Sequence, residues 1–196
     1  AITCGQRCVL KGEPGHATAL FAPPRPGMAF LVPGVACGGS DSVVLVLEHI
    51  GRSCGWEFTH MLSCESHPEN QAWVRENFPR LPLIFPDMCQ LRTGRCLNVA
   101  TGLEADAPSV DIFIAGVVCK SVSSENHQMG AHGDCIAVGT GKTGPTFEGL
   151  RRFVEKVRPQ MAIYENMVGL LSDPWVVGAQ IVDVGEAFQS FGYNFA

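Results

Sequence analysis

The 196-residue sequence lacks both an excess of positive charge and any apolar run that approaches membrane-spanning length. Its 14 lysines and arginines are outnumbered by 19 aspartates and glutamates, which gives a formal net charge of −5. A domain that binds nucleic acid by itself is usually basic, because phosphate contacts require Lys and Arg. The charge balance therefore argues against tight nucleic-acid binding by this chain alone.

Charged residues make up only 17% of the chain, whereas hydrophobic residues make up 46%. This balance is opposite to that of disordered chains, so we expect a globular domain with a sizeable core. The nine cysteines are odd in number and scattered, and three of them fall at predicted strand ends. We interpret them as free thiols of an intracellular, reducing compartment rather than as a disulfide framework.

Several common site motifs are also missing. Gly141-Lys142-Thr143 resembles the end of a P-loop, but Ile136 occupies the position where the first glycine of that motif is required. Cys4 and Cys8 have no second Cys/His pair at zinc-ligand spacing, and the histidines after residue 119 lack Cys or acidic partners. The sequence therefore predicts neither a P-loop nor a metal site.

Along the sequence, patterns typical of β-strands alternate with patterns typical of α-helices. We expect an α/β fold with a doubly wound, mostly parallel sheet and helices on both faces. The predicted strands are 28–36, 57–64, 81–85, 110–118 and 160–164, and the predicted helices are 43–50, 67–77, 145–158 and 175–191, with a further strand from 193. Residues 1–27, rich in Pro and Gly, are expected to form an irregular leader, and 89–108 a loop or irregular short helix.

The central stretch is the apolar run from Asp111 to Val118, which is followed by Cys119. The run is typical of a buried parallel strand, and open α/β sheets bind their ligands at the carboxyl ends of such strands. A thiolate at that position could act as a covalent nucleophile. The alternative is a small buried hydrophobe that ends a strand.

The first strand runs into Cys37-Gly38-Gly39, and a helix comes next with Ser40 or Asp41 as its N-cap. Glycines allow a backbone to approach a ligand, and the helix start offers free N–H donors. The alternative is a tight turn without a ligand.

Acidic residues end three other predicted strands. Glu65 at the second strand suits ribose hydroxyls, although it could equally be a solvated residue at a helix start. Asp87 ends the third strand, and Glu165-Asn166 comes after the fifth. Because parallel strands end at the same sheet edge, we expect Cys37, Glu65, Asp87, Cys119 and Glu165 to lie together.

Six segments, in order over residues 30–195, resemble the catalytic half of the cytosine-C5 DNA methyltransferases. They are Cys37-Gly38-Gly39 with Leu47-Glu48, Ser63-Cys64-Glu65, Phe85-Pro86-Asp87-Met88, Gly116-Val117-Val118-Cys119-Lys120-Ser121-Val122-Ser123, Tyr164-Glu165-Asn166-Met167-Val168-Gly169-Leu170 and Phe191-Gly192-Tyr193. The resemblance implies a Rossmann-like class I methyltransferase core and S-adenosylmethionine as cofactor. It assigns the cofactor to Cys37, Gly38, Gly39, Glu65 and Asp87, and the chemistry to Cys119 as nucleophile, Glu165 as acid and Asn166 as orienting residue.

Departures from the family pattern flank the nucleophile. Val118 stands where the family has proline, and Lys120 where it has glutamine. The Gln-x-Arg-x-Arg motif is absent, and the target-recognition domain would lie beyond Ala196. We therefore expect residues 28–196 to be a methyltransferase-like catalytic core without its target-recognition domain, either half of a methyltransferase or a protein built from that half.

Two functions are consistent with this resemblance. The first is an active cytosine-C5 methyltransferase that reaches DNA through regions outside this chain and works in the nucleus, with an organelle as the alternative location. The second is a catalytically inactive methyltransferase-like domain that serves as a structural or interaction subunit among other proteins of a larger assembly. The acidic charge and the altered nucleophile loop favour the second, whereas Cys119 and Glu165-Asn166 favour the first.

Overall fold

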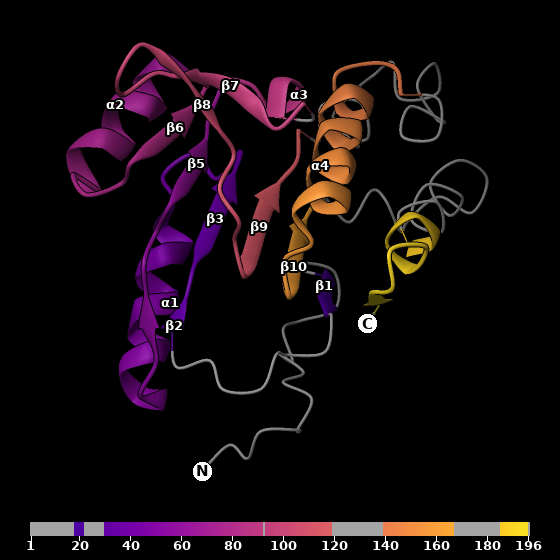
Figure 1. Cartoon of the computed structure of the whole chain (residues 1–196), viewed down its shortest axis with the longest axis horizontal. Coiled ribbons are helices and arrows are strands. Elements are labelled where there is room, and N and C mark those ends of the chain that lie inside the picture. The colour runs from indigo at the N-terminus through magenta and orange to yellow at the C-terminus, as the bar shows by residue number, and fades with distance from the viewer. Residues whose placement is uncertain (1–17, 22–29, 92, 119–138, 167–184, 196) are drawn as a thin grey trace.

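The computed structural model describes residues 18–21, 30–91, 93–118, 139–166 and 185–195. A seven-stranded sheet with the order β11-β1-β10-β9-β3-β5-β6 organises them (Figure 1). Its five parallel strands are β10 (Met161–Glu165), β9 (Ile112–Gly116), β3 (Pro33–Ala36), β5 (Leu62–Cys64) and β6 (Leu83–Phe85). The predicted α/β class with a mostly parallel sheet is confirmed.

Apolar side chains of the parallel strands point to both faces of the sheet, as expected for buried strands. Phe85 and the neighbouring Ile84 are both 1% exposed or less and belong to two separate apolar clusters. Successive strand residues point to opposite faces, so the two clusters lie on opposite sides of the sheet. Helix α2 (Pro68–Asn77) covers the Ile84 side with Val74, and α4 (Thr143–Val157) covers the other.

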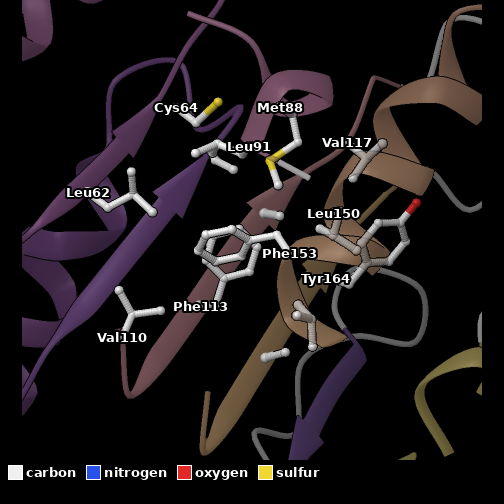
Figure 2. Packing of buried hydrophobic residues seen from close by; sticks show 14 of the residues in the cluster. Leu62, Cys64, Met88, Leu91, Val110, Phe113, Val117, Leu150, Phe153 and Tyr164 are labelled. Atoms are coloured by element: carbon white, nitrogen blue, oxygen red, sulfur yellow. The ribbon is translucent and has the colours of Figure 1, made fainter. Parts of the chain in front are cut away.

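The larger cluster contains two phenylalanine rings in contact, tilted by 37° to each other. The centroids of Phe113 in β9 and Phe153 in α4 lie 4.6 Å apart, and both side chains are buried (Figure 2). Helix α4 contributes a buried stripe at helical spacing, namely Phe147, Leu150, Phe153 and Val154. Burying each such ring stabilises the fold by roughly 1.5–3 kcal/mol. This packing fixes β9 and β10, whose ends form part of the candidate site.

Two predicted strands are shorter than expected and are split. Residues 28–36 yield β2 (Phe30–Leu31) and β3, and residues 57–64 yield β4 (Glu57–Phe58) and β5. Strands β2 and β4 pair with each other in a separate two-stranded sheet. At the first split, a residue from a distant segment contacts the backbone: Val32 N donates to the Asp111 carboxylate at 3.0 Å.

The helices agree with the predictions to within a few residues. Helix α1 (Ser42–Cys54) extends four residues beyond the predicted end and stops at Gly55, whose φ of 71° is left-handed. Helix α2 has Pro68 in its first turn, and α4 ends at Val157, with Arg158 as its C-cap. Of the predicted helix 175–191, residues 185–189 are helical, and those before 185 lie outside the described residues. No helix in the described ranges is long and apolar enough to cross a membrane.

The expectation of a loop or irregular short helix at 89–108 is wrong in part. A short helix α3 (Met88–Leu91) is followed by the antiparallel hairpin β7 (Arg95–Asn98) and β8 (Leu103–Asp106). Asn98, a poor strand former, is 3% exposed; its side chain accepts from Ile84 N at 3.1 Å and donates to the Pro82 carbonyl at 2.9 Å. These tertiary hydrogen bonds, which no local pattern reveals, hold the hairpin against β6.

The leader is also not wholly irregular. Strand β1 (Thr18–Phe21) pairs antiparallel with β10, and β11 (Asn194–Phe195), as predicted from residue 193, pairs with β1. The outer edge of β10 would leave backbone N–H and C=O groups without hydrogen-bond partners, and β1 supplies these partners. Because this requirement comes from a strand far away in the chain, the Pro-rich local sequence did not indicate it.

Candidate functional site

The site lies at the carboxyl edge of the parallel strands. Ala36 is in register with Ala115 and Cys64, Cys64 with Phe85, and Gly116 with Glu165. The residues at or directly after these strand ends include Cys37, Glu65, Asp87 and Glu165, so the structure places four of the five expected residues at one edge. Cys119, the fifth, lies outside the described residues.

The turn between β3 and α1 has an unusual backbone. Cys37 and Asp41 have φ values of 54° and 50°, in the left-handed region that non-glycine residues rarely adopt, and Gly39 has 65°. Hydrogen bonds support this conformation: Cys37 N donates to the Cys64 carbonyl and Ser40 N to the Gly38 carbonyl, both at 2.7 Å. The turn is therefore fixed against β5 rather than loosely exposed.

The two glycines of this turn face different surroundings. A Cβ on Gly38 would lie 2.7 Å from Val35 Cγ1, so this position is closed by the core. A Cβ on Gly39 would meet no atom of the described residues within 4 Å. Gly39 thus borders open space, where a ligand could approach the backbone closely.

Asp41 occupies the N-cap position of α1, one of the two predicted, but its side chain does not cap the helix. Val44 N is bonded to the Asp41 carbonyl at 2.9 Å instead. The left-handed backbone turns the carboxylate inward, where Asp41 is 1% exposed.

Glu65 is hydrogen-bonded to the glycine turn between β3 and α1. Its carboxylate accepts hydrogen bonds from Gly39 N at 2.7 Å and Ser66 N at 3.0 Å, and the residue is 5% exposed. Its carbonyl accepts from the Gln71 side chain at 2.6 Å. The alternative of a solvated glutamate at a helix start is therefore wrong. A carboxylate has about four acceptor positions, so hydrogen-bonding capacity remains for ligand hydroxyls.

Asp87, at the end of β6, is half-buried, and its Oδ1 accepts from Cys89 N at 2.8 Å. It therefore caps the start of α3. It also belongs to the electrostatic surroundings of Cys37: burial raises the pKa of the Cys37 thiol to about 12, and the charges of Glu65, Cys89, Asp87 and Asp41 add to the rise. Cys37 is consequently a neutral thiol at physiological pH and not a nucleophile.

Glu165 is exposed at the end of β10, and three strand ends meet at Gly116 beside it. A Cβ on Gly116 would lie 3.3 Å from Glu165 Oε2 and 3.2 Å from the Cys37 carbonyl oxygen. Val117 N donates to the Glu165 carbonyl at 3.3 Å. The small residue at position 116 thus lets β3, β9 and β10 converge directly before the segment that leads to Cys119.

The side chain of Asn166 donates to the Tyr164 hydroxyl at 2.8 Å. Tyr164 is 4% exposed and packs in the main core (Figure 2). Asn166 is thereby tied to a fixed group beside Glu165, which is what an orienting residue requires.

Sequence reasoning missed two residues beneath the turn, His60 and Ser63. Ser63 is buried, the side chain of His60 is 7% exposed, and Ser63 lies between Leu62 and Cys64 in a strand that is otherwise apolar. A polar residue within an apolar strand was the available signal. No group of three or more His, Cys, Asp or Glu side chains suited to a metal ion occurs in the part of the chain that the structure describes.

No protein-family model matches the chain. A curated protein does: over 146 residues the chain is 34% identical to the DNA (cytosine-5-)-methyltransferase DMT5 of Cryptococcus neoformans var. grubii. The match covers 71% of this chain but 6% of that protein. The chain is thus similar to a cytosine-5 DNA methyltransferase, which confirms the resemblance found in the sequence motifs, and it spans a small part of the relative's length.

Proposed function

We propose that this chain is the catalytic core of an S-adenosylmethionine-dependent cytosine-C5 DNA methyltransferase, with residues 28–196 forming that core. One observation carries the proposal. A backbone turn bonded to a buried carboxylate, Glu65, and an exposed carboxylate, Glu165, converge at the sheet edge from which the chain continues to Cys119. The similarity to a cytosine-5 DNA methyltransferase supports the same function.

The turn suits the cofactor. S-adenosylmethionine would supply the methyl group. Its ribose hydroxyls would donate to Glu65, whose two hydrogen bonds from backbone N–H groups leave acceptor capacity, and its adenine amino group would donate to Asp87. The Cys37-Gly38-Gly39 backbone would line the cofactor, since the open space at Gly39 permits close approach.

The chemistry requires a nucleophile and an acid. Cytosine C5 is a poor nucleophile until a thiolate adds to C6, and Cys119 would be that thiolate. Protonation at N3 favours the addition, and Glu165, exposed at the end of β10, would donate that proton. Asn166, fixed by its bond to Tyr164, would orient the base.

The target base must leave the DNA stack to reach such a site. With a net charge of −5, this chain is a poor phosphate binder, so DNA contacts would come from regions outside it, including a target-recognition domain. Similarity to a DNA methyltransferase favours the nucleus as the place of action.

The second candidate function is an inactive methyltransferase-like domain that acts as a structural subunit in an assembly. Specific residues favour it: Val118 and Lys120 differ from the family's residues on both sides of Cys119. In that case the cofactor turn would persist without bond formation to cytosine.

A mechanism-based trap separates the two functions. Full-length protein is mixed with S-adenosylmethionine and DNA that contains 5-fluorocytosine, at low salt, where phosphate contacts are strongest. The enzyme is expected to form a covalent adduct that Cys119→Ser abolishes, because a serine hydroxyl without a strong base is a far weaker nucleophile. Cys54→Ser, at an exposed cysteine that ends α1, is the matched control and should retain the adduct. Cofactor binding without any adduct would favour the structural subunit.

A further inference from the structure

Beneath the glycine turn lies a buried group of polar side chains with incomplete hydrogen bonding. Asp41 and Ser63 are 1% and 0% exposed, and the side chain of His60 is 7% exposed. Among the described residues, both carboxylate oxygens of Asp41, Nδ1 of His60 and Oγ of Ser63 have no hydrogen-bond partner. Burying such groups unpaired is costly, so a cluster of them in one place calls for an explanation.

The group contacts the turn directly. A Cβ on Gly38 would lie 2.9 Å from Asp41 Oδ1, so the carboxylate lies against the turn backbone. On its other side, Asp41 Oδ2 is 3.6 Å from His60 Nε2, which also lies 3.0 Å from the Leu62 carbonyl. A hydrogen bond to that carbonyl requires the tautomer with its proton on Nε2, and this proton is then directed at Leu62 and leaves the Asp41 carboxylate without a partner in the described part of the chain.

The negative charge of Glu65, the carboxylate proposed to bind the cofactor, disfavours the ionised form of Asp41. Burial is the main cause that raises the pKa of Asp41 to about 6; the nearby Ser63 hydroxyl lowers this pKa, and the negative charge of Glu65, a smaller contribution, raises it. Burial lowers the pKa of His60 to about 4. Within the described ranges, the titratable groups around Asp41 are His60, Glu65 and Cys37, and the last remains neutral.

We infer that Asp41 is a proton-linked positioning residue of the turn: uncharged, it lets Gly39 bond to Glu65, and ionised, it repels Glu65 and loosens that bond. The proposed change of charge needs no movement beyond the turn, because the two carboxylates contact adjacent residues of it: Glu65 accepts from Gly39 N, and Asp41 lies against Gly38. The left-handed φ angles at Cys37 and Asp41 persist only while surrounding contacts hold them, so the turn is sensitive to a change of charge beneath it.

A positively charged ligand next to Glu65 would offset the repulsion between the carboxylates of Asp41 and Glu65. This step rests on the proposed function, since S-adenosylmethionine carries a sulfonium cation and its demethylated product, S-adenosylhomocysteine, does not. Opposite charge nearby favours the ionised form of a carboxylate, so binding of the cationic cofactor should release a proton from Asp41 near pH 6. Asp41 would thereby help the site to hold the methyl donor more tightly than the product.

The first experiment needs no cofactor. Hydrogen exchange of the Gly39 amide is measured by NMR from pH 5 to 7.5 and expressed as a protection factor, which removes the intrinsic pH dependence of exchange. Protection is expected to fall about tenfold across this range, the change that corresponds to roughly 1.4 kcal/mol. Asp41→Asn, uncharged at every pH, should keep the high value throughout. Asp106→Asn, at an exposed site in β8, should behave as the wild-type chain.

Two results would overturn the inference. One is a Gly39 protection factor that does not change with pH in the wild-type chain, or that changes equally in Asp41→Asn. The other is an NMR titration in which the His60 ring shows the full imidazolium shift near pH 6, which would place the proton on His60 instead of Asp41.

Calorimetry in two buffers of different ionisation enthalpy then tests the ligand step. Near pH 6, binding of S-adenosylmethionine should release a proton from the protein, whereas binding of S-adenosylhomocysteine should not. In Asp41→Asn, this difference in proton release between the two ligands should disappear. Equal proton release by both ligands would refute this step. If neither ligand binds, the proposed function fails, whereas the exchange experiment still decides the role of Asp41.

Discussion

Two glutamates sit at the ends of strands in the same parallel sheet and at the same edge, yet their surroundings differ. Glu65 is 5% exposed, and two backbone N–H groups hold its carboxylate at 2.7 and 3.0 Å. Glu165 is exposed, and its Oε2 faces Gly116. The first is a buried carboxylate fixed by backbone donors, and the second is a carboxylate that solvent can reach.

The difference arises from the neighbours that each strand end meets. After β5, the chain passes beneath the β3–α1 turn, so backbone donors surround Glu65. At the end of β10, the Glu165 carbonyl accepts from Val117 N, while its side chain remains exposed. A carboxylate that must donate a proton has to reach its substrate, whereas one that holds hydroxyls benefits from being immobile.

The largest effect should come from Glu165→Gln. If Glu165 is the acid, the rate of adduct formation with 5-fluorocytosine DNA should fall by about 10²–10⁴, because an amide cannot supply the proton. Affinity for S-adenosylmethionine, measured by calorimetry, should stay within about twofold of wild type, a change of well under 1 kcal/mol. Loss of cofactor affinity on the same scale as the rate would break the division of roles between the two glutamates.

Glu65→Gln should show the opposite pattern at a smaller scale. The amide would present an N–H₂ group near the N–H of Gly39 or Ser66, so one backbone donor loses its acceptor. Cofactor binding should weaken by about 1–3 kcal/mol, the range for a lost hydrogen bond to a charged group. Calorimetry measures the change, and an unaltered affinity would mean that Glu65 serves the turn alone.

Gly39→Ala tests the turn from the backbone side. With φ at 65°, an alanine would be forced into the left-handed region at a cost of about 1–2 kcal/mol in the free energy of unfolding. Chemical denaturation measures this value. The new methyl group would also enter the open space where the cofactor is expected, so affinity should fall as well. A variant of wild-type stability that binds the cofactor normally would contradict this account of the turn.

The smallest effect is expected at a third glutamate, away from the edge. Glu104 in β8 lies 3.2 Å from Arg95 Nε, and both side chains are more than 60% exposed. Exposed ion pairs contribute about 0–1 kcal/mol. Glu104→Gln should therefore leave the cofactor affinity and the adduct rate unchanged, and it is the control for the two glutamates at the edge. An effect equal to that of Glu165→Gln would show that net charge, not position, governs the rate.

The sequence patterns predicted the strands and helices that place the two glutamates. The apolar run before Cys119 indicated a buried strand, and β9 lies within it at Ile112–Gly116. The predicted helix 145–158 corresponds to α4, which buries Phe147, Leu150 and Phe153. Because parallel strands end at one edge, these local signals also placed Glu65 and Glu165 at the same edge.

Other features depended on contacts between distant segments. The hairpin β7–β8 forms around Asn98, whose partners Pro82 and Ile84 lie in or near another strand. Strand β1 pairs with the edge of β10. No property of residues 18–21 themselves predicts this pairing. Local propensity is a weak guide at such positions, since strand pairing and burial override it.

The sequence by itself therefore determined the five parallel strands, the main helices between them and the edge where the acidic residues end, since hydrophobic period and strand direction are local properties. Only the tertiary structure decided which glutamate is buried and which is exposed. It also decided that Asp41 turns inward toward His60 instead of capping α1. Burial and hydrogen-bond partners depend on what other segments bring to a residue, and that information lies outside its own neighbourhood in the chain.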